Sequence, residues 1–99
     1  MIRAAIAEPH PEMRSAIRLL LGLSNNMEVV FEAENGQQAI EYVEQHQPDV
    51  LVMDIFVPEL NGLTATRRIN ALPLLTRVIL ISSLTRYGIV EGARAAGAH

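Results

Sequence analysis

The sequence contains no cysteine, no tryptophan and no lysine, so several kinds of site are excluded at once. Without cysteine the chain can form neither disulfides nor thiolate metal sites. Its apolar runs are short, as in Val50 to Met53, whereas a membrane span needs about 20 consecutive apolar residues. The first residues show no signal-peptide pattern. We therefore expect a cytoplasmic protein that makes no contact with the membrane.

The chain also has few basic residues. Acidic residues outnumber them, and the formal net charge is −3. This balance gives no electrostatic reason to expect DNA binding by the segment itself. The chain has 99 residues, of which 49% are hydrophobic, and this is typical of one globular domain. We expect a single domain over residues 1–99, with no second domain in this chain.

Four short apolar runs have the character of buried strands. They are continuously apolar rather than alternating, which is typical of strands covered on both faces. Pro9 ends the first run, because proline has no N–H to donate to a strand ladder. The predicted strands are 2–7, 27–33, 50–53 and 77–81.

Helical patterns separate and follow these strands. The predicted helices are 11–22, a segment after Asn35 that ends before Pro48, 63–72, and 86–96 capped by Gly97. In the first helix, the spacing of Met13, Ile17, Leu20 and Leu21 predicts one buried face. Alternating strands and helices indicate a parallel α/β sheet with right-handed crossovers.

Three polar residues follow predicted strands directly: Glu8, Asp54 and Ser82. In open parallel sheets, ligands bind beyond the carboxyl ends of the strands. If the strand order is 2-1-3-4, these residues stand on adjacent strands, about 4.8 Å apart. Taken singly, an Asp or Ser after a strand is usually a turn or cap residue, and Asp49 is interpreted as such. The joint occurrence at three strand ends favours a site.

The chemistry of such a site follows from its charges. Two ionised carboxylates about 5 Å apart repel by roughly 3 kcal/mol at an effective dielectric near 20. A proton or a cation relieves this repulsion, and a set of oxygen ligands suits Mg²⁺. A carboxylate beside such a cation can accept a phosphoryl group, to which the Ser82 hydroxyl would donate a hydrogen bond.

The segment Val52 to Gly62, VMDIFVPELNG, resembles the phosphoacceptor loop of response regulator receiver domains. The segment Ile6 to Pro11, IAEPHP, resembles the acidic opening of the NarL/LuxR-type subfamily, which 65–69 and 93–98 also match. The resemblance runs over essentially the whole chain. It implies a flavodoxin-like (CheY-like) doubly wound sheet of order 2-1-3-4, with strand 5 and helix 5 of the family absent from this chain.

The resemblance also implies roles. Asp54 would accept a phosphoryl group from a sensor histidine kinase, and Ser82 would be the switch hydroxyl. Mg²⁺ would be held by Glu8, Asp54 and the backbone carbonyl of Phe56. The domain would be no enzyme beyond self-catalysed phosphotransfer and dephosphorylation. The helix that contains Tyr87 would belong to the output face.

Two departures from the family qualify these roles. Pro9 stands where the second acidic residue of the family binds the metal, so we expect weaker Mg²⁺ binding. The family's lysine lies on the fifth strand, which this chain does not reach. Without that strand, 78–81 form an exposed apolar edge. We favour a fragment of a longer protein, with DNA binding only through an unseen C-terminal domain, and a possible homodimer through the fourth helix and strand.

Two alternatives stay open. One is an atypical pseudo-receiver, a dimerisation or interaction module that works without phosphorylation, which Pro9 favours. The other is a flavodoxin-like ligand-binding domain or phosphotransfer enzyme. The latter needs a phosphate-cradling loop after the first strand, and 8–11 contain no glycine and two prolines without N–H donors. His10 is interpreted as a helix N-terminal residue rather than a metal ligand.

Overall fold

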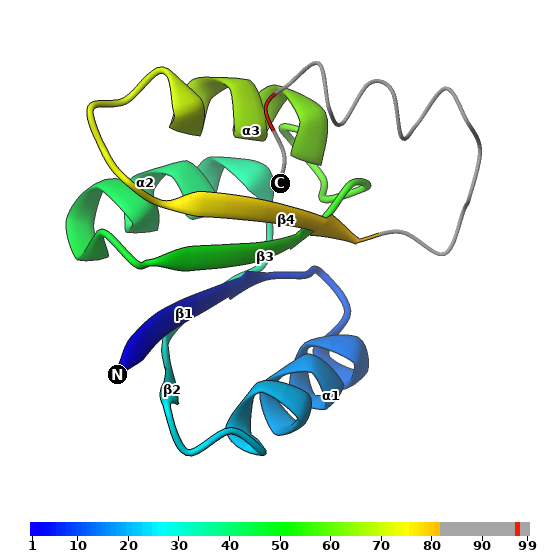
Figure 1. Cartoon of the computed structure of the whole chain (residues 1–99). Helices are drawn as coiled ribbons and strands as arrows, with labels where there is room; N and C mark the ends of the chain where they lie inside the picture. Colours follow the sequence, from blue (N-terminus) through cyan, green and yellow to red (C-terminus); the bar gives the residue numbers. More distant parts are fainter. Residues whose placement is uncertain (82–96, 98–99) are drawn as a thin grey trace.

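The computed structural model describes residues 1–81 and 97. Strands and helices alternate along this part of the chain, as the apolar pattern predicts (Figure 1). The elements are β1 (Ile2–Ala7), α1 (Pro11–Gly22), β2 (Met27–Ala33), α2 (Gly36–His46), β3 (Val50–Asp54), α3 (Gly62–Asn70) and β4 (Arg77–Ile81).

The strands form one parallel sheet in the order β2-β1-β3-β4, which confirms the predicted order. The crossover after β2 passes over β1, so β1 and β3 become neighbours at the centre. Ala7 pairs with Met53, and Asp54 pairs with Ile81. The carboxyl ends of β1, β3 and β4 therefore meet at one edge, where ligands bind in sheets of this kind.

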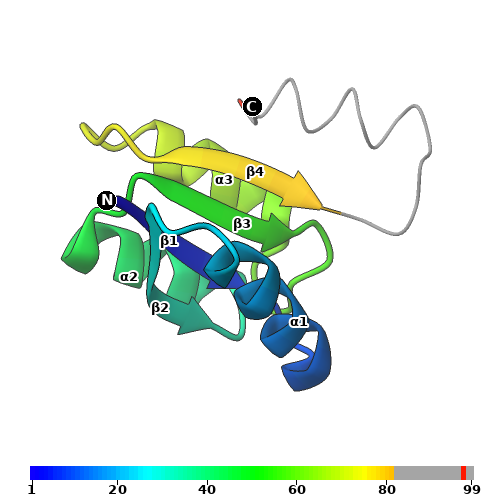
Figure 2. The same cartoon turned by 60° about the horizontal axis from the view of Figure 1, so that its bottom comes forward.

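Helices lie on both faces of the sheet: α2 and α3 on one, α1 on the other (Figures 1 and 2). The main core fills the space between α2, α3 and the sheet. Alternate β3 residues, Leu51 and Met53, point into it and are fully buried, because side chains of a strand alternate between its faces. The same cluster includes Val43, Ile69 and Val78.

Helix α1 corrects one prediction. Of its apolar residues only Ile17 is buried, while Met13 and Leu20 are 52% and 68% exposed. The apolar residues occupy a band about half of the helix circumference wide, and the part that meets the sheet lies at one edge of this band, at Ile17. Two ion pairs lie on this side of the helix: Arg14 Nε and Arg18 Nη1 lie 3.4 and 3.3 Å from the Glu32 carboxylate on β2.

Asparagine caps begin the other two helices. The Asn35 side chain accepts a hydrogen bond from Gln38 N, as predicted for the start of α2, and Asn61 accepts one from Thr64 N. Helix α3 is shorter than predicted and ends at Asn70 rather than at residue 72. The predicted helix 86–96 lies outside the described residues, but Gly97 has the positive φ (97°) typical of a helix-ending glycine.

None of the helices described between residues 1 and 81 is long and apolar enough to cross a membrane.

Candidate functional site

Asp54 is the last residue of β3, and its side chain is half-buried. Its Oδ1 accepts a hydrogen bond from Phe56 N at 2.8 Å, which fixes the carboxylate against the following loop. Within residues 1–81, no hydrogen bond engages Oδ2. Among the described residues, the protein therefore holds one oxygen of Asp54 and leaves the other without a hydrogen bond.

The loop after Asp54 is held by the sheet on one side and by α3 on the other. Ile55 N donates to Ile81 O on β4 at 3.1 Å, and Gly62 N donates to Ile55 O at 2.8 Å. The backbones approach so closely that a Cβ on Gly62 would lie 2.7 Å from Asp54 O. The pair Asn61-Gly62 is a turn signal in the sequence, but its support of this loop was not predicted.

A second glycine brings α2 against the same loop. Gly36 N donates to Pro58 O at 3.3 Å, and a Cβ on Gly36 would overlap the carbonyl oxygen of Leu60. The segment between Asp54 and α3 is therefore in contact with three elements, β4, α3 and α2. Sequence reasoning missed this role of Gly36, for which Asn35-Gly36 gives only a helix-start signal.

Glu8 follows β1 and is almost fully buried, with 1% of its surface exposed. Its N–H donates to Ala33 O on β2 at 2.9 Å, and its carbonyl accepts from Arg14 Nη1 at 2.9 Å. Its Oε1 lies 3.1 Å from His10 N and 2.8 Å from His10 Nδ1. Its Oε2 is buried and has no hydrogen-bond partner in the described part of the chain.

The strand register relates these two acidic residues. Because Ala7 pairs with Met53, Glu8 and Asp54 take the next positions along neighbouring strands. The sheet thus brings the two predicted carboxylate positions to adjacent strand ends. Ser82 follows Ile81, the partner of Asp54, but Ser82 and Tyr87 themselves lie outside the described residues. The roles assigned to Glu8, Asp54, Phe56 and Ser82 stay predictions.

The donor set fits Mg²⁺ in kind but is small. Carboxylate and carbonyl oxygens of Glu8, Asp54 and Phe56 are the ligands that this ion prefers. The unpaired buried Oε2 of Glu8 also fits, since buried polar atoms ordinarily have a partner. Pro9 adds no side-chain ligand, and among the described residues no group of three or more His, Cys, Asp or Glu is arranged to hold a metal.

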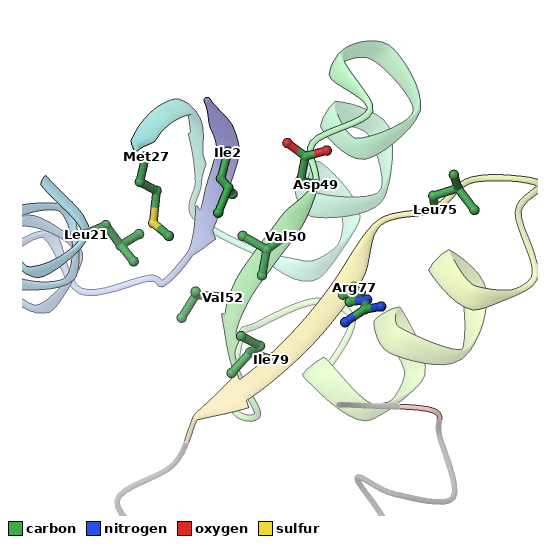
Figure 3. Close-up of a pocket in the computed structure, with 9 residues that line it drawn as sticks. All are labelled: Ile2, Leu21, Met27, Asp49, Val50, Val52, Leu75, Arg77 and Ile79. Atoms are coloured by element: carbon green, nitrogen blue, oxygen red, sulfur yellow. The ribbon is translucent and has the colours of Figure 1, made fainter. Parts of the chain in front are cut away.

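A hollow of about 460 Å³ lies on another part of the molecule, on the sheet face over β3 and β4 (Figure 3). Its lining is mostly apolar, with Asp49 and Arg77 as the charged members, and none of Glu8, Asp54 and Phe56 takes part. It is lined by Ile2, Leu21, Met27, Asp49, Val50, Val52, Leu75, Arg77 and Ile79. This hollow is therefore separate from the acidic strand ends.

An acidic residue at the end of a central strand, beside a second buried acid, is the arrangement implied by the resemblance noted above. The family model described as "Response regulator receiver domain" matches residues 4–99. The chain belongs to this family. The receiver domain has strands, strand order and helices in the places that the family resemblance implies.

Individual relatives agree with this membership. The receiver domain is 40% identical to the chemotaxis protein CheY of Bacillus subtilis over 97% of this chain and 79% of that protein. It is 35% identical to the uncharacterized transcriptional regulatory protein YvfU of the same organism, over 100% of this chain and 50% of that protein. The solved receiver domain of the putative response regulator NarL from Mycobacterium tuberculosis superposes with a TM-score of 0.95. It is 34% identical, over 98% of this chain and 78% of that chain.

The two relatives from Bacillus subtilis differ in how much of their length the chain covers. The chain spans most of CheY but only half of YvfU. Receiver domains function in signalling, and in the longer relative the matched part is accompanied by further chain.

Proposed function

We propose that this receiver domain accepts a phosphoryl group on Asp54 from a sensor histidine kinase and thereby switches an attached output. One observation carries the proposal. In this member of the family, the half-buried Asp54 ends the central strand next to buried Glu8, and one of its oxygens has no hydrogen bond from residues 1–81. A phosphorylated state would favour the arrangement that binds the phosphoryl group better.

The residues would divide the work as follows. Asp54 Oδ2 attacks the phosphorus of the kinase phosphohistidine, whose P–N bond breaks as the imidazole leaves, while the Phe56 N–H holds Oδ1 and keeps the carboxylate oriented. The Ser82 hydroxyl donates a hydrogen bond to a phosphoryl oxygen. Glu8, Asp54 and the Phe56 carbonyl would hold Mg²⁺, which when bound offsets the charge between carboxylate and phosphoryl oxygens. Binding is expected to be weak because Pro9 supplies no ligand. Beyond this self-catalysed transfer, we propose no enzymatic activity of the domain.

The test uses a small phosphodonor. The protein is incubated with phosphoramidate or acetyl phosphate and Mg²⁺, and its intact mass is measured. We expect the added mass of one phosphoryl group, which disappears on treatment with hydroxylamine and is not formed by Asp54→Asn. Absence of any adduct at saturating donor, on the natural full-length protein, contradicts the proposal.

The wider setting is proposed from the relatives. Similarity to the transcriptional regulators YvfU and NarL supports a transcriptional output, with DNA bound only by a separate C-terminal domain. Residues 1–99 would then be an incomplete receiver domain of a longer cytoplasmic protein. A homodimer would form through the side of β4 and the following helix. Size-exclusion chromatography with light scattering, before and after phosphorylation, tests the dimer.

A pseudo-receiver is the second candidate, and Pro9 is the observation that favours it. With Pro9 in place of an acid, and no group of three metal-binding residues among 1–81 and 97, the domain would act as an interaction module without phosphorylation. Under this candidate the oligomeric state is the same for Asp54→Asn as for the natural sequence. It also predicts no phosphoryl adduct, so the two candidates separate in one experiment.

A further inference from the structure

We propose that His10 is a positioning residue, which turns the Glu8 carboxylate so that Oε2 is the oxygen presented to a divalent cation. The inference rests on the proposed function, because it concerns the same site. It assigns to His10 a task that the sequence did not suggest, since the residue had been interpreted only as the start of a helix.

The hydrogen bonds of Glu8 are distributed unequally. Its N–H, its carbonyl and Oε1 are each engaged, by Ala33, Arg14 and His10 respectively. Oε2 is the exception, since it is buried and has no partner among residues 1–81 and 97. The carboxylate is therefore asymmetric, with one oxygen bound to His10 and the other without a hydrogen-bond partner in the described part of the chain.

His10 makes both bonds to Oε1. Its backbone N lies 3.1 Å and its ring Nδ1 lies 2.8 Å from Oε1. The backbone N–H donates to Oε1, and the direction of the bond between Nδ1 and Oε1 follows from the tautomer of the ring. Two contacts from one residue to the same oxygen fix both the position of the carboxylate and its rotation about the last side-chain bond.

The ring does this instead of capping its own helix. His10 is the N-cap residue of α1, a position where side chains ordinarily accept from the first helical N–H groups, yet it makes no such bond. Its side chain is 78% exposed, so packing does not hold it in place. The contact with Glu8 is the specific interaction that its ring makes in the described structure.

Glu8 has more need of such a partner than an aspartate would. Its side chain is one methylene longer, so it has an additional rotatable bond. Pro9, the next residue, adds no carboxylate to those of Glu8 and Asp54. Residues that orient a metal ligand through a hydrogen bond typically change metal affinity by about 10–100-fold when they are replaced. His10 has the geometry of such a residue.

The experiment measures Mg²⁺ binding directly, by isothermal titration calorimetry on the natural full-length protein. His10→Ala removes the ring contact with Oε1, whereas His10→Asn keeps a hydrogen-bonding side chain at a similar distance from the backbone. We expect His10→Ala to weaken Mg²⁺ binding about 10-fold, the low end of the usual range because the ring is exposed, and His10→Asn to stay close to the natural sequence. Thermal unfolding of both variants without metal shows whether the fold is kept.

A double variant tests whether His10 acts through Glu8. In a Glu8→Gln background the carboxylate is gone, so adding His10→Ala should leave the remaining Mg²⁺ affinity unchanged. An equal loss in both backgrounds would mean that His10 contacts the cation or acts elsewhere, and that result overturns the proposal.

Other outcomes are equally decisive. A His10→Ala protein that is less stable but binds Mg²⁺ as before overturns the inference and leaves Asp54 phosphorylation standing. Tighter binding by His10→Ala also overturns it, because the ring would then compete with the cation. If the natural protein neither binds Mg²⁺ nor takes up phosphoryl from phosphoramidate, the proposed function itself fails, and the inference with it.

Discussion

Asp49 precedes β3 and Asp54 is its last residue, and the two carboxylates differ in their hydrogen bonds. Asp49 lies at the amino end, where Oδ2 accepts from Arg3 N at 2.7 Å and holds the helix-to-strand turn. Asp54 lies at the carboxyl end with Oδ2 unengaged by the described residues. We predict that Asp54→Asn abolishes phosphoryl uptake, whereas Asp49→Asn, whose amide oxygen still accepts from Arg3, keeps it. Intact mass spectrometry after phosphoramidate treatment measures both, and equal uptake by the two variants would refute the assignment.

Gly62 is the residue whose replacement should disturb the acceptor loop most directly. An added Cβ would lie 2.7 Å from Asp54 O and 2.8 Å from Ile55 Cα, both backbone atoms that cannot move aside cheaply. We predict that Gly62→Ala lowers the free energy of unfolding by about 1–3 kcal/mol and slows phosphoryl uptake. Urea unfolding measures the first effect and adduct formation over time the second.

The matched control for that change is Gly22→Ala. Gly22 ends α1, and a Cβ there would have nothing within 4 Å. Alanine is also the better helix former, by up to about 1 kcal/mol. The control should be as stable as the natural sequence or slightly more so. A loss at Gly22 as large as that at Gly62 would mean that close approach at Asp54 is not the cause.

At the scale of elements, the cap of α3 connects local structure to the site. Asn61 Oδ1 accepts from Thr64 N at 2.9 Å, and the helix that it starts packs through Gly62 against the Asp54 loop. We predict that Asn61→Ala costs about 1 kcal/mol of stability, while Asn61→Asp keeps the cap. Asn25→Ala, in an exposed turn, is the control. Chemical denaturation of the three variants decides, and an undiminished Asn61→Ala would show that the cap contributes nothing.

The elements also show where sequence reasoning works. Four continuous apolar runs and the Pro and Asn signals between them predicted the strands and the Asn35 cap, because backbone constraints are local. The buried side of α1 was not predictable in the same way. Leu19, Leu20 and Leu21 make the apolar band of the helix wide. The side of α1 that meets the sheet also carries Arg14 and Arg18, which pair with Glu32 on another element.

At the scale of the whole molecule, topology made the neighbouring positions of the two acidic strand ends predictable. A sheet of order 2-1-3-4 necessarily brings the residues after β1 and β3 together, so Glu8 and Asp54 could be named before their contacts were known. The bond between His10 and Glu8 could not, because it depends on how the β1–α1 connection turns. The close approaches of Gly36 and Gly62 likewise arise only when α2, α3 and the loop are packed together.

The stability of the whole domain should depend on the core between α2, α3 and the sheet. Leu51 is the second residue of β3 and is fully buried, between Ala5 on β1 and Val78 on β4. We predict that Leu51→Ala lowers the free energy of unfolding by about 2–5 kcal/mol, a large part of the roughly 5–15 kcal/mol typical of a domain.

Leu19→Ala, at a side chain that is 73% exposed, is the control for that loss and should change stability by no more than about 0.5 kcal/mol. Denaturant midpoints with unchanged slopes give both values. Equal effects at the two positions would contradict the burial of Leu51. Leu51 and Asp54 lie on the same strand, but the change to alanine removes only side-chain atoms in the core. We therefore expect Leu51→Ala to keep phosphoryl uptake at temperatures where the protein is still folded. If the Leu51→Ala protein loses uptake only when it unfolds, the core stabilises the fold that holds Asp54 and takes no part in the phosphoryl transfer itself.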